Sequence, residues 1–128
     1  MTKLEIKGTD KSPKFILEGS TGSIKILGRS TMVNPHEFYG SILSEIKKYA
    51  LYPANKTHLL IDLEYYNTLS SRYLLNILKI ISRINHLPKK EAKIIWYFDE
   101  EDYAIQEDIQ LFSKITSFNI QSVAYEYY

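Results

Sequence analysis

Four polar side chains lie within five positions where an apolar segment gives way to a segment with helical periodicity. Residues 58–65 are mostly apolar, and the polar residues just beyond them are Asn67, Thr68, Ser70 and Ser71. The first N–H groups of a helix have no partners within the helix, and the helix dipole places partial positive charge there. The Thr68 hydroxyl is therefore expected to cap the helix or to carry a phosphate that these N–H groups stabilise.

Other residues of this chain could in principle support catalysis. The carboxylates of residues 99–102 could hold Mg²⁺, but an acidic run at the start of a helix is what the helix dipole favours. Hydrolytic triads could be drawn from the serines and histidines Ser30, Ser70, Ser71, His36, His58 and His86. No G-x-S-x-G sequence and no phosphate-binding glycine loop accompanies them. We therefore predict a protein that is not an enzyme and that has no metal site and no cofactor.

Composition limits the remaining classes of function. The chain has 128 residues, no cysteine and a formal net charge of +1. This size favours a single domain over residues 1–128, and the charge gives no reason to expect binding to nucleic acid. No apolar run approaches the ~20 residues that span a bilayer, and the N-terminus lacks a signal-peptide core. We expect a cytoplasmic protein without membrane insertion.

The elements that must position these side chains follow from periodicity. Residues 1–12 are expected to form an N-terminal arm. A helix is predicted from an Asn34 N-cap to about Ala50, with Phe38, Ile42, Ile46 and Tyr49 facing inward. A second helix is predicted over 69–84 and a third from residue 99. Strands are predicted over 14–18, 23–27, 58–65, 93–98 and 118–127.

This order predicts an α/β fold with one mixed sheet, in which an N-terminal hairpin is followed by α-β-α-β-α-β with three helices. In strand 58–65, positions 59, 61, 63 and 65 are predicted to share one apolar face. The carboxyl ends of parallel strands meet at one edge of a sheet. We therefore expect Ser30, Thr68 and the acidic run 99–102 to lie at the same end of the molecule.

Three segments of the sequence resemble the SiaC-type regulatory phosphoproteins. Gly28-Arg29-Ser30, followed by Asn34 and Glu37-Phe38-Tyr39, is similar to the family's G-x-S-x-P-E-N…F-F/Y segment. Tyr65-Tyr66-Asn67-Thr68 with Ser70 resembles its Y-F-N-T-S-S signature, and Trp96-Tyr97-Phe98-Asp99 resembles its W-x-Y-D strand end. The motifs occur in the family's order and cover nearly the whole chain.

The resemblance implies a switch protein with a fold similar to STAS domains and anti-sigma-factor antagonists. It implies that a partner kinase phosphorylates Thr68 and that a PP2C-type phosphatase removes the phosphate. The dephosphorylated form would bind a downstream effector such as a diguanylate cyclase. The residues expected to contact partners are Ser30, Tyr66, Asn67, Leu69, Ser70 and Ser71.

Two positions depart from the family pattern. Met32-Val33 replaces a Pro-Glu pair, and Leu69 occupies the position of the first serine after the threonine. An ungapped alignment makes Ser70 the hydroxyl that supports Thr68. Reading Leu69 as an insertion would align Ser70-Ser71 with the family serines and make Ser71 the supporting hydroxyl instead. The alternative function is a module that binds a protein or a small ligand constitutively, without phosphorylation.

Overall fold

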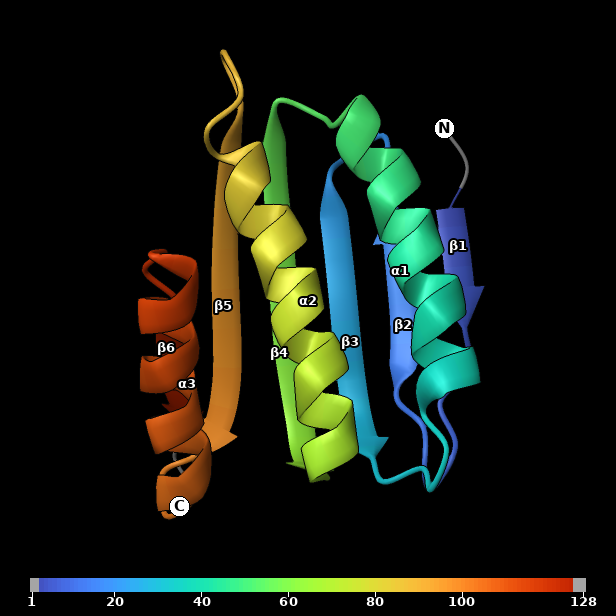
Figure 1. The fold of residues 1–128 in the computed structure, drawn as a ribbon, viewed down its shortest axis with the longest axis vertical. Coiled ribbons are helices and arrows are strands. Elements are labelled where there is room, and N and C mark those ends of the chain that lie inside the picture. The colour runs from blue at the N-terminus through green and yellow to red at the C-terminus, as the bar shows by residue number, and fades with distance from the viewer. Residues whose placement is uncertain (1–2, 126–128) are drawn as a thin grey trace.

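A computed structural model describes residues 3–125, which form a six-stranded sheet with three helices on one face (Figure 1). The strands lie side by side in their order along the chain. The elements are β1 (Lys3–Ile6), β2 (Lys14–Glu18), β3 (Ser23–Ser30), α1 (His36–Leu51), β4 (Lys56–Tyr66), α2 (Thr68–Ile84), β5 (Glu91–Asp99), α3 (Tyr103–Thr116) and β6 (Gln121–Tyr125).

The direction of the strands explains why the helices share a face. Strands β1, β2 and β3 pair antiparallel, and β3 to β6 pair parallel. Each parallel pair is joined through a helix, and each connection moves the chain one strand further in the same direction. Right-handed crossovers that all advance in one direction place every helix on the same side. The predicted α/β fold with a mixed sheet is confirmed.

The prediction of an arm over residues 1–12 is wrong for residues 3–6, which form the edge strand β1. Leu4 pairs with Leu17, and Ile6 pairs with Phe15. Both β1 side chains are half-buried against the core. Charged and apolar residues alternate in this strand, as is typical of an antiparallel strand that has one face exposed to solvent. Of the last predicted strand, residues 126 and 127 lie outside the described range.

The start of α1 also differs from the prediction. Pro35, not Asn34, is the N-cap, and its backbone already has helical angles, so no side chain caps this helix. The Tyr39 N–H donates to the Pro35 carbonyl at 2.9 Å. Tyr39, rather than Phe38, is fully buried together with Ile42, Ile46 and Tyr49. The inward stripe of α1 is therefore rotated by one residue at its N-terminal end.

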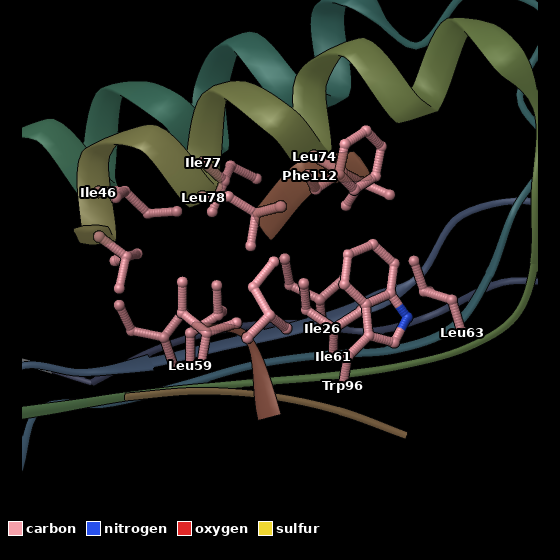
Figure 2. Packing of buried hydrophobic residues seen from close by; sticks show 14 of the residues in the cluster. Ile26, Ile46, Leu59, Ile61, Leu63, Leu74, Ile77, Leu78, Trp96 and Phe112 are labelled. Atoms are coloured by element: carbon pink, nitrogen blue, oxygen red, sulfur yellow. The ribbon is translucent and has the colours of Figure 1, made fainter. Parts of the chain in front are cut away.

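The core lies between the helices and the sheet (Figure 2). Trp96 on β5 is its largest fully buried side chain, and its ring stacks on Phe112 of α3 with centroids 5.8 Å apart. Figure 2 shows the indole nitrogen directed toward Leu63. Within residues 3–125 this nitrogen is a buried donor without a hydrogen bond, which costs about 1–3 kcal/mol. Trp96 therefore contributes through packing rather than through polar contacts.

An irregular register at the end of β4 decides which tyrosine enters the core. Gly28 pairs with Leu63, but Arg29 pairs with Tyr65, so Glu64 is an extra residue on β4. Gly28 has a φ of 116°, which suits glycine and strains other residues. The bulge reverses the faces beyond it, since side chains alternate along a strand. Tyr65, predicted to face the core, is 53% exposed, and Tyr66 turns inward instead.

None of the helices within residues 3–125 is both long enough and apolar enough to cross a membrane.

Candidate functional site

The junction between β4 and α2 presents Thr68 to solvent. Asn67 is the N-cap of α2, and its side-chain oxygen accepts a hydrogen bond from the Ser70 N–H at 2.9 Å. Thr68, the first residue of the helix, is exposed. The expectation that the Thr68 hydroxyl caps the helix is therefore wrong, because the preceding amide does so. Among residues 3–125, no partner hydrogen-bonds the Thr68 hydroxyl, which is free to react.

Asn67 also fixes the junction to the loop that follows β3. Its N–H donates to the Ser30 carbonyl at 3.0 Å, and its side-chain Nδ2 donates to the Met32 carbonyl at 2.9 Å. One residue thus caps α2 and fastens two backbone segments that are more than thirty positions apart in the sequence. Because these contacts occupy both ends of the amide, Asn67 holds Thr68 at a fixed place on the surface.

A chain of buried hydroxyl groups lies beneath the junction. Ser30 donates to Ser70 at 2.8 Å, and Ser70 donates in turn to the Ser30 carbonyl at 3.1 Å. The Ser30 oxygen is also 2.5 Å from the Tyr39 hydroxyl. Since a hydroxyl has only one proton to donate, Tyr39 must be the donor to Ser30. The order of donation is therefore Tyr39 to Ser30 to Ser70, ending on a backbone carbonyl.

Burial keeps this chain in one protonation state. Desolvation raises the pKa of Tyr39 to about 12, partly offset by its hydrogen bonds to the two serines. Tyr39 also stacks on Tyr73, whose hydroxyl lies 2.9 Å from Nδ1 of His36. The phenol stays protonated at neutral pH, which the donor role assigned to it requires.

The structure separates the two serines that could support Thr68. Ser70 is fully buried and bonds to Ser30, whereas Ser71 is half-buried and donates to the Thr68 carbonyl at 2.7 Å. Neither serine hydrogen-bonds the Thr68 hydroxyl. Ser71 therefore hydrogen-bonds the backbone of Thr68, and Ser70 links the first turn of α2 to the buried end of β3.

The six predicted contact residues thus divide by exposure. Ser30 and Ser70 have no exposed surface, so in this conformation they position their neighbours and cannot touch a partner. Leu69 is 48% exposed beside Thr68. The side chains of Asn67, Ser71 and Tyr66 are half-buried. The accessible surface at the junction therefore centres on Thr68 and Leu69.

Tyr66 connects the junction to α3. Its hydroxyl donates to the Asp108 carboxylate at 2.5 Å, and its ring lies 6.0 Å from that of Trp96. Burial first, and then the negative charge of Asp108, raise the pKa of Tyr66 well above its usual range. Tyr66 is consequently a neutral donor that fixes the end of β4 against α3.

An acidic pocket of about 750 Å³ lies at the same end of the sheet, as predicted. Its carboxylates come from the ends of β4 and β5 and from the turn before α3, namely Asp62, Glu64, Asp99, Glu101 and Asp102. No group of side chains in residues 3–125 has the arrangement of a metal site. The pocket therefore gives the end of β4, four residues before Thr68, an acidic environment.

Three contributors to this site were not anticipated from the sequence. Arg72 lies one helical turn beyond Thr68 and is exposed, a spacing at which side chains on a helix are neighbours. That i, i+4 spacing could have identified it. Tyr39 and Asp108 act through contacts with residues 9 and 42 positions away, and only the tertiary structure reveals these.

Comparison with solved structures shows that other proteins have the same fold. The chain superimposes on the crystal structure of apo-SiaC from Pseudomonas aeruginosa with a TM-score of 0.84 and 22% identity, over 97% of this chain and all of that one. Equally similar, with a TM-score of 0.84, is a chain from the crystal structure of the diguanylate cyclase SiaD in complex with its activator SiaC from the same species, at 22% identity over 95% of this chain and 99% of that one.

Sequence comparison identifies the family. An uncharacterized protein of Pseudomonas aeruginosa strain UCBPP-PA14 is 23% identical over 118 residues, 92% of this chain and 93% of that protein. Residues 6–125 match the sequence pattern of the SiaC family of regulatory phosphoproteins. The match extends from the edge strand β1 to the end of β6, and so includes the whole junction around Thr68. The chain therefore belongs to the SiaC family of regulatory phosphoproteins.

Proposed function

We propose that this protein is a non-enzymatic, cytoplasmic signalling switch whose state is the phosphorylation of Thr68. A partner kinase adds the phosphate and a PP2C-type phosphatase removes it. The dephosphorylated form binds a downstream effector, and the SiaC that forms a complex with the diguanylate cyclase SiaD makes an enzyme of that class the first effector to test. Membership of a family of regulatory phosphoproteins supports the general role.

The observation that carries the proposal is the contrast between Thr68 and the hydroxyl groups around it. Ser30 and Ser70 are buried, and Ser71 donates its proton to a backbone carbonyl. Thr68 is exposed, without a hydrogen-bond partner in residues 3–125, and rests on a backbone fixed by Asn67. A kinase needs a reachable hydroxyl in a defined position, and Thr68 fits this requirement best in the junction.

Phosphorylation would change the electrostatics of the junction more than its fold. The phosphate carries about −1.5 to −2 charges at neutral pH. The first N–H groups of α2 can stabilise it, so the helix should tolerate the modification. A partner surface matched to the neutral threonine would meet this new charge. A loss of about 3 kcal/mol is enough to weaken binding about a hundredfold.

The proposed acceptor can be tested by mass spectrometry. Incubation with ATP and a partner kinase should raise the intact mass of the protein by about 80 Da, one phosphoryl group. Thr68→Ala should abolish this gain, whereas Ser71→Ala, a matched loss of a hydroxyl one turn away, should retain it. Full labelling of Thr68→Ala would show that another residue is the acceptor.

A binding experiment distinguishes the switch from the alternative of a constitutive module. The switch requires the effector to bind the unmodified protein and to lose affinity for the phosphorylated form. A constitutive module would bind both forms equally. Titration calorimetry with the two purified forms measures this difference directly. Equal affinities would show that phosphorylation does not regulate binding.

A further inference from the structure

Helices α1 and α2 lie side by side on the sheet and run in the same direction (Figure 1). A hollow of about 400 Å³ lies between their C-terminal ends. A second hollow of about 340 Å³ continues it toward the middle of the helices, and the two share Lys47, Ile80 and Arg83. We call them together the α1–α2 groove, which lies between residues 43–51 and residues 76–87.

The end of the groove nearest the helix C-termini has an apolar lining. Ile84 is buried and Ile80 is half-buried within it. Leu51 and Leu87 stand at its border and are 71% and 41% exposed. A single exposed leucine is ordinary, but apolar side chains gathered in a groove between helices are typical of a surface that binds another chain. This end of the groove therefore offers apolar area to a ligand.

Positive charge lines both walls of the groove. Lys47 projects from α1, and Lys79 and Arg83 project from α2. Among residues 3–125, no carboxylate forms an ion pair with any of the three. The helix dipole favours cations in the last turn, which accounts for Arg83 but not for Lys79, more than one turn before the end of α2. The charge therefore exceeds what the helices themselves require.

No carboxylate in the neighbouring sequence balances this charge. Neither Asp nor Glu occurs between Glu45 and Asp62, or between Glu64 and Glu91. Glu45 itself forms an ion pair with Lys48 at 3.4 Å. In the described part of the chain, the residues that line the two hollows include no acidic one. The groove is thus locally basic, although the whole chain has a formal net charge of only +1.

We propose that the α1–α2 groove binds an acidic amphipathic helix of a partner protein. Apolar side chains at positions i, i+4 and i+7 of that helix would pack on Ile80 and the apolar end of the groove. Its carboxylates would face Lys47 on one wall and Arg83 on the other. The proposal is independent of phosphorylation at Thr68, which precedes Ile80 by twelve residues, about 18 Å along α2.

Other anionic ligands match these features less well. Nucleic acid is held through its phosphates, which would leave the apolar lining unused. Proteins that lie on a membrane insert a projecting apolar face, whereas Ile80 and Ile84 lie in a recess. A small molecule needs a site that covers most of its surface, and this groove is bordered by exposed side chains such as Leu51 and Arg83. A helix can cover both hollows at once.

Fluorescence anisotropy with three synthetic peptides tests the proposal on the full-length, unmodified protein. The first peptide has leucines at helical spacing and glutamates between them. The second replaces every glutamate with lysine, and the third replaces every leucine with serine. The glutamate–leucine peptide should bind with a Kd below about 1 mM and at least about tenfold more tightly than the other two, because the groove supplies both positive charge and apolar area.

Substitutions in the groove should weaken this binding. Lys47→Glu should raise the Kd of the glutamate–leucine peptide about tenfold, because it replaces an attraction with a repulsion. Leu51→Ser should raise it several-fold by removing apolar contact without changing charge. Lys114→Glu and Leu111→Ser make the same changes at exposed positions of α3 and should leave the Kd unchanged. Circular dichroism of each variant confirms that the fold is retained.

Reversing the charge of both walls gives the decisive result. Lys47→Glu/Arg83→Glu should bind the lysine–leucine peptide more tightly than the glutamate–leucine peptide. Lys7→Glu/Lys114→Glu changes the net charge equally at exposed positions outside the groove, and should keep the original preference. A general attraction between opposite net charges would act alike in both double variants.

Three results would overturn the proposal. One is a glutamate–leucine peptide that binds no more tightly than the lysine–leucine peptide, including the case in which neither binds. Another is an equal response of the two double variants. The third is co-sedimentation with phosphatidylserine vesicles that Lys47→Glu/Arg83→Glu abolishes, without binding of any peptide. That result would assign the groove to a membrane surface.

Discussion

Two strand-to-helix junctions lie at the carboxyl edge of the sheet, and in each a side chain accepts a hydrogen bond from an N–H group of the first helical turn. The two capping side chains differ in charge. At the β4–α2 junction Asn67 caps the helix through a neutral amide, and at the β5–α3 junction Asp102 caps it through a carboxylate that accepts from the Ile105 N–H at 3.0 Å. The first residue of each helix, Thr68 or Tyr103, is exposed. The second junction already supplies negative charge to its helix, whereas the cap of the first is neutral.

The junctions also differ in how they are held. The β4–α2 junction is fastened by buried hydroxyl groups and by Asn67, which bonds to the loop after β3. The turn before α3 is held by local contacts, such as the 2.9 Å bond from the Glu101 N–H to Asp99. A rigid neutral junction suits a residue that another protein must find and modify. A locally closed acidic junction suits a surface whose charge stays constant.

The largest expected effect comes from placing permanent charge at the neutral junction. Thr68→Asp should lower the affinity for a diguanylate cyclase effector about a hundredfold, because a carboxylate imitates part of the charge of a phosphate. Tyr103→Asp adds the same charge to the already acidic junction and should change affinity much less. Calorimetric titration of both variants measures the contrast. Equal losses would show that the effector responds to total charge rather than to Thr68.

Removing the two caps should reveal the difference in anchoring. Asp102→Ala loses one cap and should lower the free energy of unfolding by about 1 kcal/mol. Asn67→Ala loses the cap and the bond to the Met32 carbonyl, so we expect about 2 kcal/mol. Urea denaturation of the two variants gives both values. If Asn67→Ala is no more costly than Asp102→Ala, the bond to the loop after β3 contributes nothing to stability.

High pH should weaken the anchored junction selectively. The pKa of Tyr39 is raised to about 12, so the folded state retains a proton that the unfolded state loses near pH 10. Stability is therefore unaffected by this group below about pH 10 and falls by up to about 1.4 kcal/mol per pH unit as the pH rises toward 12.

Urea denaturation across this range checks the prediction on the unmodified protein and Tyr39→Phe. The variant should lose stability less steeply with pH, since among the tyrosines of residues 3–125 it is then Tyr66 alone whose pKa is raised. Parallel pH profiles would mean that Tyr39 does not carry the dependence.

The smallest expected effect concerns Arg72. If Thr68 carries a phosphate, the guanidinium one turn away should lower the second phosphate pKa slightly, since such helix pairs contribute about 0.3–0.5 kcal/mol. Arg72→Gln should raise that pKa by about 0.3 unit. Phosphorus NMR titration of the phosphorylated proteins measures it, with Arg83→Gln as the control for loss of charge at the far end of α2. An unchanged value would place Arg72 outside the phosphate's reach.

Much of this architecture could be predicted from the sequence because its signals are local. The apolar run of β4, the polar residues after it and the helical period of α2 locate the junction, and crossover handedness brings the acidic residues to the same edge. The family resemblance and the mixed α/β sheet are confirmed. Thr68 as phosphate acceptor and the residues that contact partners remain predictions.

The errors arise where tertiary contacts override local preference. Strand β1 was missed because a short charged edge strand has no core-like run. Ser30 and Ser70 were predicted to contact a partner; both are buried and hydrogen-bonded to each other across 40 positions of the sequence. No local signal reports such a pairing. The inward turn of Tyr66 depended on a bulge that alternation alone could not anticipate.

That bulge has a consequence for how the site can vary. Because Glu64 is an added residue on β4, the side chains after it lie on the opposite face of the sheet from the one that plain alternation gives. Tyr66 therefore faces the core, and the chain enters Asn67 and Thr68 from that orientation. The exposure of Thr68 therefore depends on the number of residues after Leu63 as well as on their kinds. A gain or loss of one position here would reorient the whole junction even if every side chain kept its type.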